Sequence, residues 1–184
     1  MWQFVRVTEV ETEPELWSLY ENSFPRCERR SMAQHVRAMQ EQPSFCCVKI
    51  CAHGCVVGLL FFWEMEHCVF LEHLAIAPEY RRQGGGRMAL KWLQGKGLPI
   101  VLEIEPPADV RTCGRLKFYE SCGFIRLPYP HVQAAFHADT HSVPLDLLSW
   151  PCEMNSADVE KFEIFLRETV MTYTDAESSN HYCT

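Results

Sequence analysis

The chain has 184 residues, of which 47% are hydrophobic, so we expect it to bury one core. Seventeen basic and 24 acidic side chains give a net charge of -7, which disfavours nucleic acid and anionic membranes as partners. Residues 1–6 lack a secretory apolar region, and no apolar run reaches the roughly 18 residues of a membrane span. The sequence therefore predicts a cytoplasmic protein with reduced thiols.

Two helix starts are predicted near the N-terminus. Residues 12–15, Thr-Glu-Pro-Glu, match a capping box that would open a helix with Leu16 and Tyr20 on one face. Residues 31–34, Ser-Met-Ala-Gln, repeat the signal and predict a second helix.

Residues 44–50, 56–64 and 68–76 are rich in β-branched and aromatic side chains and predict a series of strands. Residues 52–54, Ala-His-Gly, are typical of a hairpin turn between the first two strands. The cysteine cluster from Cys46 to Cys55 surrounds this turn, but its spacing is not that of paired C-x-x-C ligands. We expect small strand residues there and no metal, although the role of the cluster stays open.

The stretch from Leu71 to Leu90 carries the strongest functional signal. A strand that ends in Leu74-Ala75-Ile76 is followed by a basic, glycine-rich turn and then by a helix. Glycine allows positive φ and close approach of the backbone to a ligand, and the free N–H groups of a helix start attract anions. The turn therefore predicts a phosphate cradle, formed by Arg81, Arg82, Gln83, Gly84, Gly85, Gly86 and Arg87.

Two common phosphate motifs are excluded. A P-loop needs a glycine five residues before Gly95-Lys96, where Leu90 stands. A dinucleotide fingerprint needs a glycine three residues after Gly86, and there is none. The phosphate-binding motif that remains is Arg81-x-x-Gly84-x-Gly86.

Helices and strands alternate in the rest of the chain. The predicted elements are a helix over 86–94, a strand over 99–105, a helix over 113–121, and strands near Phe124 and over 143–148. Asn155 would cap a last helix, whose apolar stripe from Val159 to Val170 predicts core packing or, alternatively, a homodimer interface. Residues 174–184 are polar and expected to fray.

The cradle motif, followed by Phe118-Tyr-Glu-Ser-Cys-Gly-Phe124, resembles the GNAT superfamily of acetyl-CoA-dependent N-acetyltransferases. The resemblance covers about residues 1–150 and is sharpest from Leu71 to Phe124, which leaves residues 151–184 as a C-terminal helix and polar tail. It implies an α/β (α+β) fold with a mixed, largely antiparallel central sheet flanked by helices and a C-terminal helical extension.

The resemblance also implies acetyl-CoA as cosubstrate, with no metal. Backbone groups of Leu74, Ala75 and Ile76 would bind the pantetheine arm, and the cradle would hold the pyrophosphate. The sequence departs from the family pattern at Arg82, where glycine is frequent, and at Gly85, where a bulky apolar residue is usual.

Candidate catalytic residues follow from the same resemblance. Glu72 lies on the strand beside the thioester, where several members carry a glutamate that contacts or deprotonates the amine, and Tyr119 would assist the departing thiolate. Glu103 and Glu105 alternate on the next strand, so both leave one face and would either bind a cationic substrate or form a solvated or ion-paired surface. Crowded carboxylates would raise at least one pKa.

The predicted function is transfer of an acetyl group to a primary amine by direct attack in a ternary complex. The acceptor, a small molecule or a peptide, stays open, and the protein would be a monomer or homodimer. The main alternative is a non-catalytic acyl-CoA-binding or sensing domain. A redox or metal sensor built on the cysteines is a third hypothesis.

Overall fold

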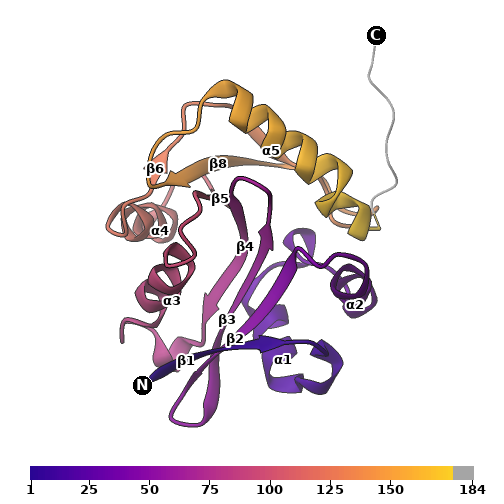
Figure 1. The fold of residues 1–184 in the computed structure, drawn as a ribbon, viewed down its shortest axis with the longest axis vertical. Coiled ribbons are helices and arrows are strands. Elements are labelled where there is room, and N and C mark those ends of the chain that lie inside the picture. The colour runs from indigo at the N-terminus through magenta and orange to yellow at the C-terminus, as the bar shows by residue number, and fades with distance from the viewer. Residues whose placement is uncertain (176–184) are drawn as a thin grey trace.

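The computed structural model describes residues 1–175, in which a mixed sheet carries helices on both faces (Figure 1). The strands are β1 Trp2–Val7, β2 Phe45–Ala52, β3 Cys55–Glu64, β4 Val69–Ile76, β5 Ile100–Ile104, β6 Ile125–Arg126, β7 His131–Gln133 and β8 Val143–Trp150. The helices are α1 Pro14–Ser23, α2 Met32–Glu41, α3 Gly85–Gln94, α4 Val110–Glu120 and α5 Ser156–Glu168. Short 3-10 turns cover Val10–Thr12, Arg26–Glu28, Pro78–Tyr80 and Val170–Tyr173.

The strand order is β1-β2-β3-β4-β5-β8-β6, and β7 pairs with β8. Among the strands within residues 1–175, only β4 and β5 run parallel, so the expected largely antiparallel sheet is confirmed. Strands β1 and β7 were not predicted, because one is a mostly exposed edge strand and the other has three residues.

The two parallel strands, β4 and β5, are paired over only part of their length. Strands β4 and β5 pair only between residues 69–71 and 100–102, although β4 continues to Ile76 and β5 to Ile104. The backbone of the second half of β4 therefore has a strand partner on one side only, which is β3.

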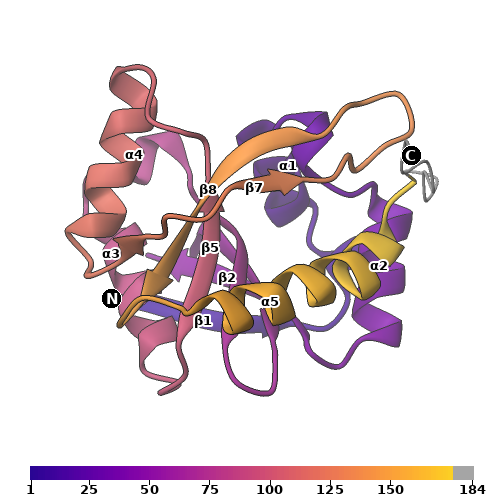
Figure 2. The same cartoon turned by 90° about the horizontal axis from the view of Figure 1, so that it is seen from above.

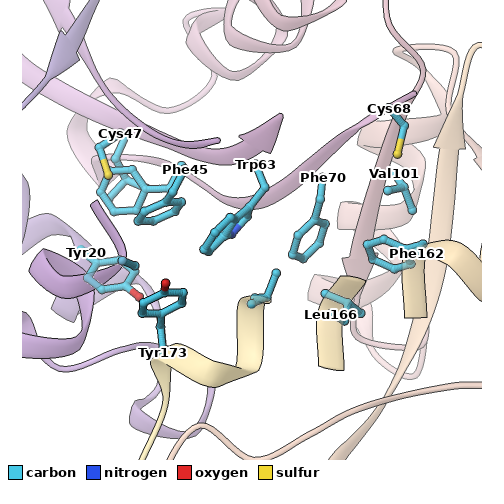
Figure 3. Close-up of a cluster of buried hydrophobic side chains, with 14 of the residues drawn as sticks. Tyr20, Phe45, Cys47, Trp63, Cys68, Phe70, Val101, Phe162, Leu166 and Tyr173 are labelled. Atoms are coloured by element: carbon cyan, nitrogen blue, oxygen red, sulfur yellow. The ribbon is translucent and has the colours of Figure 1, made fainter. Parts of the chain in front are cut away.

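Helices α1, α2 and α5 cover one face of the sheet, and α3 and α4 cover the other (Figures 1 and 2). The first face buries an aromatic cluster that includes Tyr20, Trp63, Phe70 and Phe162 (Figure 3). Phe162 belongs to the apolar stripe of α5, and its ring centroid lies 5.1 Å from that of Phe70. The interpretation of this stripe as core packing is confirmed, and each such side chain contributes about 1.5–3 kcal/mol by burial.

Capping residues and apolar periodicity in the sequence predicted most helix starts correctly. Ser31 and Gln34 form the predicted capping box of α2. The box predicted at Thr12 is wrong, because the Thr12 hydroxyl donates to Glu9 within a 3-10 turn and α1 begins at Pro14. Helix α4 begins three residues earlier than predicted, because Asp109 and Thr112 form a capping box of their own.

The turn after β2 is the predicted hairpin, with positive φ at His53 and Gly54. The neighbouring Cys46 and Cys47 belong to opposite faces of β2. The Sγ atom of Cys47 lies 3.1 Å from Nε2 of His35 in the core. Within residues 1–175, no group of three metal-ligating side chains gathers, and no helix is long and apolar enough to cross a membrane. Of the tail expected to fray, residues 176–184 lie outside the described residues.

Candidate active site

A cavity of about 400 Å³ opens where β4 and β5 separate. Its walls come from the second half of β4, the end of β5, helix α4 and the 3-10 turn before α2. Of the predicted site residues, the lining includes Glu72, Leu74, Ala75, Ile76, Arg81, Glu103, Glu105 and Tyr119. The structure therefore gathers residues from both sequence motifs around one space.

The predicted cradle has the geometry of an anion site. Helix α3 begins at Gly85 after Gly84, whose φ is 86°, and in the part of the chain that the structure describes no side chain caps this helix. The first backbone N–H groups of α3 have no carbonyl one turn earlier to bind, so they are free to bind an anion. Arg82 also has positive φ, 60°, which is strained for a residue with a side chain.

Gly85 departs from the family pattern for a visible reason. A Cβ atom at this position would lie 2.6 Å from the Trp2 ring, so the indole of β1 occupies the space of the usual side chain. Gly86 is also close to a neighbour, since a Cβ there would lie 3.2 Å from Phe118 on α4.

The three arginines of the cradle have different surroundings. The Nε of Arg81 donates to the Ile76 carbonyl at 2.9 Å, and Arg87 donates to the carbonyl and hydroxyl of Ser121, both at 2.9 Å. The guanidinium of Arg87 thus joins α3 to the end of α4, and the part of Arg87 in the cradle stays a prediction. Among residues 1–175, no hydrogen-bond partner holds the exposed side chain of Arg82.

Glu72 is the extra residue of a β-bulge. His73 and Leu71 pair with consecutive residues of β3, so Glu72 lies between them without a paired residue on β3. The bulge places Glu72 and His73 on the same face of the sheet, instead of on the opposite faces of a regular strand.

The carboxylate of Glu72 is buried in an ion pair. Its Oε1 lies 2.7 Å from an Arg30 nitrogen, its Oε2 accepts from Trp63 at 3.0 Å, and the two charged side chains are 2% and 0% exposed. Burial would raise the pKa of Glu72, but the Arg30 guanidinium lowers it to about 2. These contacts argue against Glu72 as the base, because so acidic a group takes up a proton poorly.

Glu105 is also neutralised. Arg111 binds both of its carboxylate oxygens, at 2.7 and 2.8 Å, and Arg115 binds one at 2.9 Å. The hydrogen bonds from Arg111 lower the pKa of Glu105. Of the two alternatives expected for Glu105, the structure supports the ion-paired surface, and the pKa of Glu105 is lowered and not raised by crowding.

Glu28, which was not predicted, is the cavity carboxylate without an ion-pair partner among the described residues. Its backbone carbonyl accepts from His73 at 2.9 Å, which holds the turn against β4. Burial and then the nearby charge of Glu105 raise the pKa of Glu28, so its surroundings favour uptake of a proton.

Glu103 is hydrogen-bonded to two residues of β7, and one of them, Gln133, also lines the cavity. One carboxylate oxygen binds His131 Nε2, and the other accepts from Gln133 at 3.2 Å. The second ring nitrogen of His131 lies 2.6 Å from Glu163 on α5. The candidate site thus includes side chains from β7 and the last helix.

Tyr119 lines the cavity from α4, one helical turn after Arg115. Burial raises the pKa of Tyr119 to about 12, although Arg115 lowers it in part. The phenol therefore stays protonated at neutral pH and can donate a hydrogen bond.

A sequence profile of the Acetyltransferase (GNAT) family matches residues 10–124. The chain belongs to this family. A relative, YjbC of Bacillus subtilis (strain 168), named as a predicted acetyltransferase, is 29% identical over 126 residues, an alignment that covers 64% of this chain and 62% of YjbC. This chain thus spans less than two thirds of that relative's length.

Solved structures share the GNAT fold. A predicted acetyltransferase of the family from Bacteroides thetaiotaomicron has a TM-score of 0.80 and 22% identity, with 92% of this chain and 98% of that chain covered. An aminoglycoside 6'-N-acetyltransferase complexed with coenzyme A has a TM-score of 0.58 and 14% identity, with 85% and 99% covered. At these identities the likeness establishes the fold alone.

Proposed function

We propose that this GNAT protein transfers the acetyl group of acetyl-CoA to a primary amine by direct attack in a ternary complex. The observation that carries the proposal is the end of the β4–β5 ladder after residue 71, which leaves one side of β4 open to the cavity. An open strand edge offers backbone N–H and C=O groups to an extended ligand such as a pantetheine arm.

The acetyl-CoA would lie along β4 and end at α3. Backbone groups of residues 74–76 would bind the pantetheine and polarise the thioester carbonyl, and the pyrophosphate would meet the first N–H groups of α3. Arg82, the cradle arginine with a free side chain, would add a charged hydrogen bond. In the aminoglycoside acetyltransferase structure, the same fold is complexed with coenzyme A.

The acceptor amine would bind between Glu28 and Glu103. Glu103 would hold the ammonium group, and Glu28, whose pKa is raised, would take its proton. The free amine then attacks the thioester carbonyl, the carbon–sulfur bond breaks, and the Tyr119 hydroxyl donates to the sulfur as negative charge develops.

The acceptor is proposed to be a small molecule or a peptide with a primary amine. Glu72 and Glu105 each have arginine partners, so the cavity presents mixed charges rather than a purely acidic surface. A polycation therefore gains less here than the net charge of the chain suggests.

The test is thiol release from acetyl-CoA across polyamines, amino acids, aminoglycosides and peptides, with mass spectrometry of the acetylated product. We expect amine-dependent release that is lost in Gly86→Val, because the added side chain blocks the approach of the phosphate to the backbone. Gly114→Val is the matched control, since open space surrounds Gly114 on α4. Coenzyme A binding by calorimetry without any amine-dependent release would favour the non-catalytic alternative, and unchanged binding in folded Gly86→Val would exclude the cradle.

A further inference from the structure

We propose that His131 and Glu163 are positioning residues that hold the Glu103 carboxylate at the acceptor side of the cavity. Helix α5 would then be part of the active site, although it follows the last strand of the sheet. The inference rests on the proposed function, since Glu103 is the group assigned to the ammonium of the acceptor.

Three elements bring these side chains together. Glu103 comes from β5, His131 from β7 and Glu163 from α5, and His131 lies between the two carboxylates. The His131 side chain is 0% exposed, that of Glu103 is 7% exposed, and that of Glu163 is 38% exposed. Glu103, His131 and Glu163 thus form a row of hydrogen-bonded side chains. The row runs from the cavity wall, through the interior, to the surface of α5.

The row requires a protonated imidazole. A neutral histidine has one N–H group, whereas two ionised carboxylates can both be satisfied only by the two N–H groups of an imidazolium. Burial alone would lower the pKa of His131, but hydrogen bonds to Glu103 and Glu163 outweigh burial and raise it. Glu163 therefore supplies charge that keeps Nε2–H on the side of Glu103.

No other ionisable side chain among the described residues competes for this ring. The strand partner of His131 on β8 is Leu145, and Phe162 of α5 packs at a ring-centroid distance of 6.2 Å. Asp146, the next residue of β8, is paired with Arg126. Glu103 and Glu163 are thus the two charges that set the protonation of His131.

Positioning follows from how Glu103 is bound. His131 holds one carboxylate oxygen and Gln133 holds the other, so the rotation of the carboxylate is restricted. Each oxygen can still accept a further hydrogen bond, and Glu103 lines the cavity. When pH rises through the pKa of His131, one of the two imidazole hydrogen bonds loses its proton. Where that proton is Nε2–H, Glu103 keeps only the hydrogen bond from Gln133, its carboxylate is less restricted, and binding of the ammonium weakens.

The experiment compares Glu163→Gln with Glu160→Gln, an exposed position on the same helix that also loses one negative charge. Two quantities are measured in wild type and both variants. The first is the titration of the His131 ring by NMR, and the second is the KM for the acceptor amine and for acetyl-CoA as a function of pH.

In Glu163→Gln we expect the His131 pKa to fall by about one unit, because the charge is lost while an amide oxygen can still accept from Nδ1–H. We also expect the KM for the amine to rise about five- to fifty-fold near neutral pH, with the rise beginning at lower pH than in wild type. The KM for acetyl-CoA and the properties of Glu160→Gln should stay within twofold of wild type.

Three results would overturn the proposal, and they are distinguishable. An unchanged His131 titration in Glu163→Gln would show that Glu163 does not control the ring. A shifted titration with an unchanged amine KM would show that the row stabilises the fold without positioning Glu103. A wild-type protein without amine-dependent acetyl transfer would remove the proposed function itself, and the positioning role with it.

Discussion

Arg30 and Glu72 form an ion pair with 2.7 Å between nitrogen and oxygen, and both side chains are almost completely excluded from solvent. The guanidinium carbon of Arg30 also lies 5.3–5.5 Å from the ring centroids of Phe45, Trp63 and Phe136. An ionised carboxylate left in this aromatic setting without its partner is costly. The pair therefore has a structural role beneath the cavity.

Arg30→Met should destabilise the protein by about 3–5 kcal/mol, because it leaves the Glu72 charge unpaired. Adding Glu72→Gln should recover part of this loss in a urea titration, while Glu72→Gln alone should lower kcat less than tenfold.

The ion pair of Arg30 and Glu72 also predicts a pH dependence of stability. The pKa of Glu72 is about 2 in the fold and roughly 4.3 in an unfolded chain. The contribution of Glu72 to the free energy of unfolding is therefore fully present above roughly pH 4.3 and is lost as pH falls toward 2. A thousandfold lower kcat in a stable Glu72→Gln protein would instead restore Glu72 as the base.

Glu28→Gln should lower kcat by about 10² to 10⁴ near neutral pH, because the amide keeps the shape of the side chain but cannot take a proton. Part of the activity should return at alkaline pH, where the amine is already deprotonated. Steady-state kinetics from pH 6 to 10 measures both effects, with Glu15→Gln, exposed on α1, as the control. Wild-type rates in Glu28→Gln would assign the proton to another acceptor, such as Glu103 or water.

Arg82→Ala and Arg82→Gly separate strain from binding. Both should weaken acetyl-CoA binding by about 1.5–3 kcal/mol in calorimetry, since each removes the same guanidinium. Arg82→Gly should nevertheless be about 1 kcal/mol more stable than Arg82→Ala, because the positive φ at this position suits glycine. Equal affinity for acetyl-CoA in all three proteins would mean that Arg82 does not bind the phosphates.

Tyr119→Phe should lower kcat by about 10 to 10³ and change acetyl-CoA affinity by only a few-fold, because the ring still packs and a transition-state hydrogen bond is lost. The readouts are single-turnover acetyl transfer and calorimetric binding of acetyl-CoA. Loss of binding with intact turnover would make Tyr119 a packing residue.

The parts of the site that local chemistry determines could be predicted from the sequence. The glycines that open α3, the capping residues of α2 and the aromatic residues of α4 act within a few positions of themselves, so their pattern can be read along the chain. The bulge at Glu72 could not be read in this way, because it depends on how β4 pairs with β3.

Long-range partners could not be predicted either. Arg30 lies 42 residues before Glu72, and His131 lies 28 residues after Glu103 and 32 before Glu163. Nothing in the sequence around Glu72 signals that its charge is neutralised, and His131 lies in a segment whose three-residue strand was not recognised. Glu72, the base predicted from the sequence, is therefore a paired carboxylate, whereas no sequence motif marks Glu28.

The hydrogen bonds from Arg87 to Ser121 join the helix that begins the cradle to the end of the helix that carries Tyr119. Gly86 and Phe118 meet along the same seam. Because residues in contact commonly couple, we expect a substitution in one signature of the family to change the free energy of a substitution in the other. Paired variants across the seam should depart from additivity. The groups proposed to hold the pyrophosphate and to assist the thiolate would then respond to each other through the contact of α3 with α4.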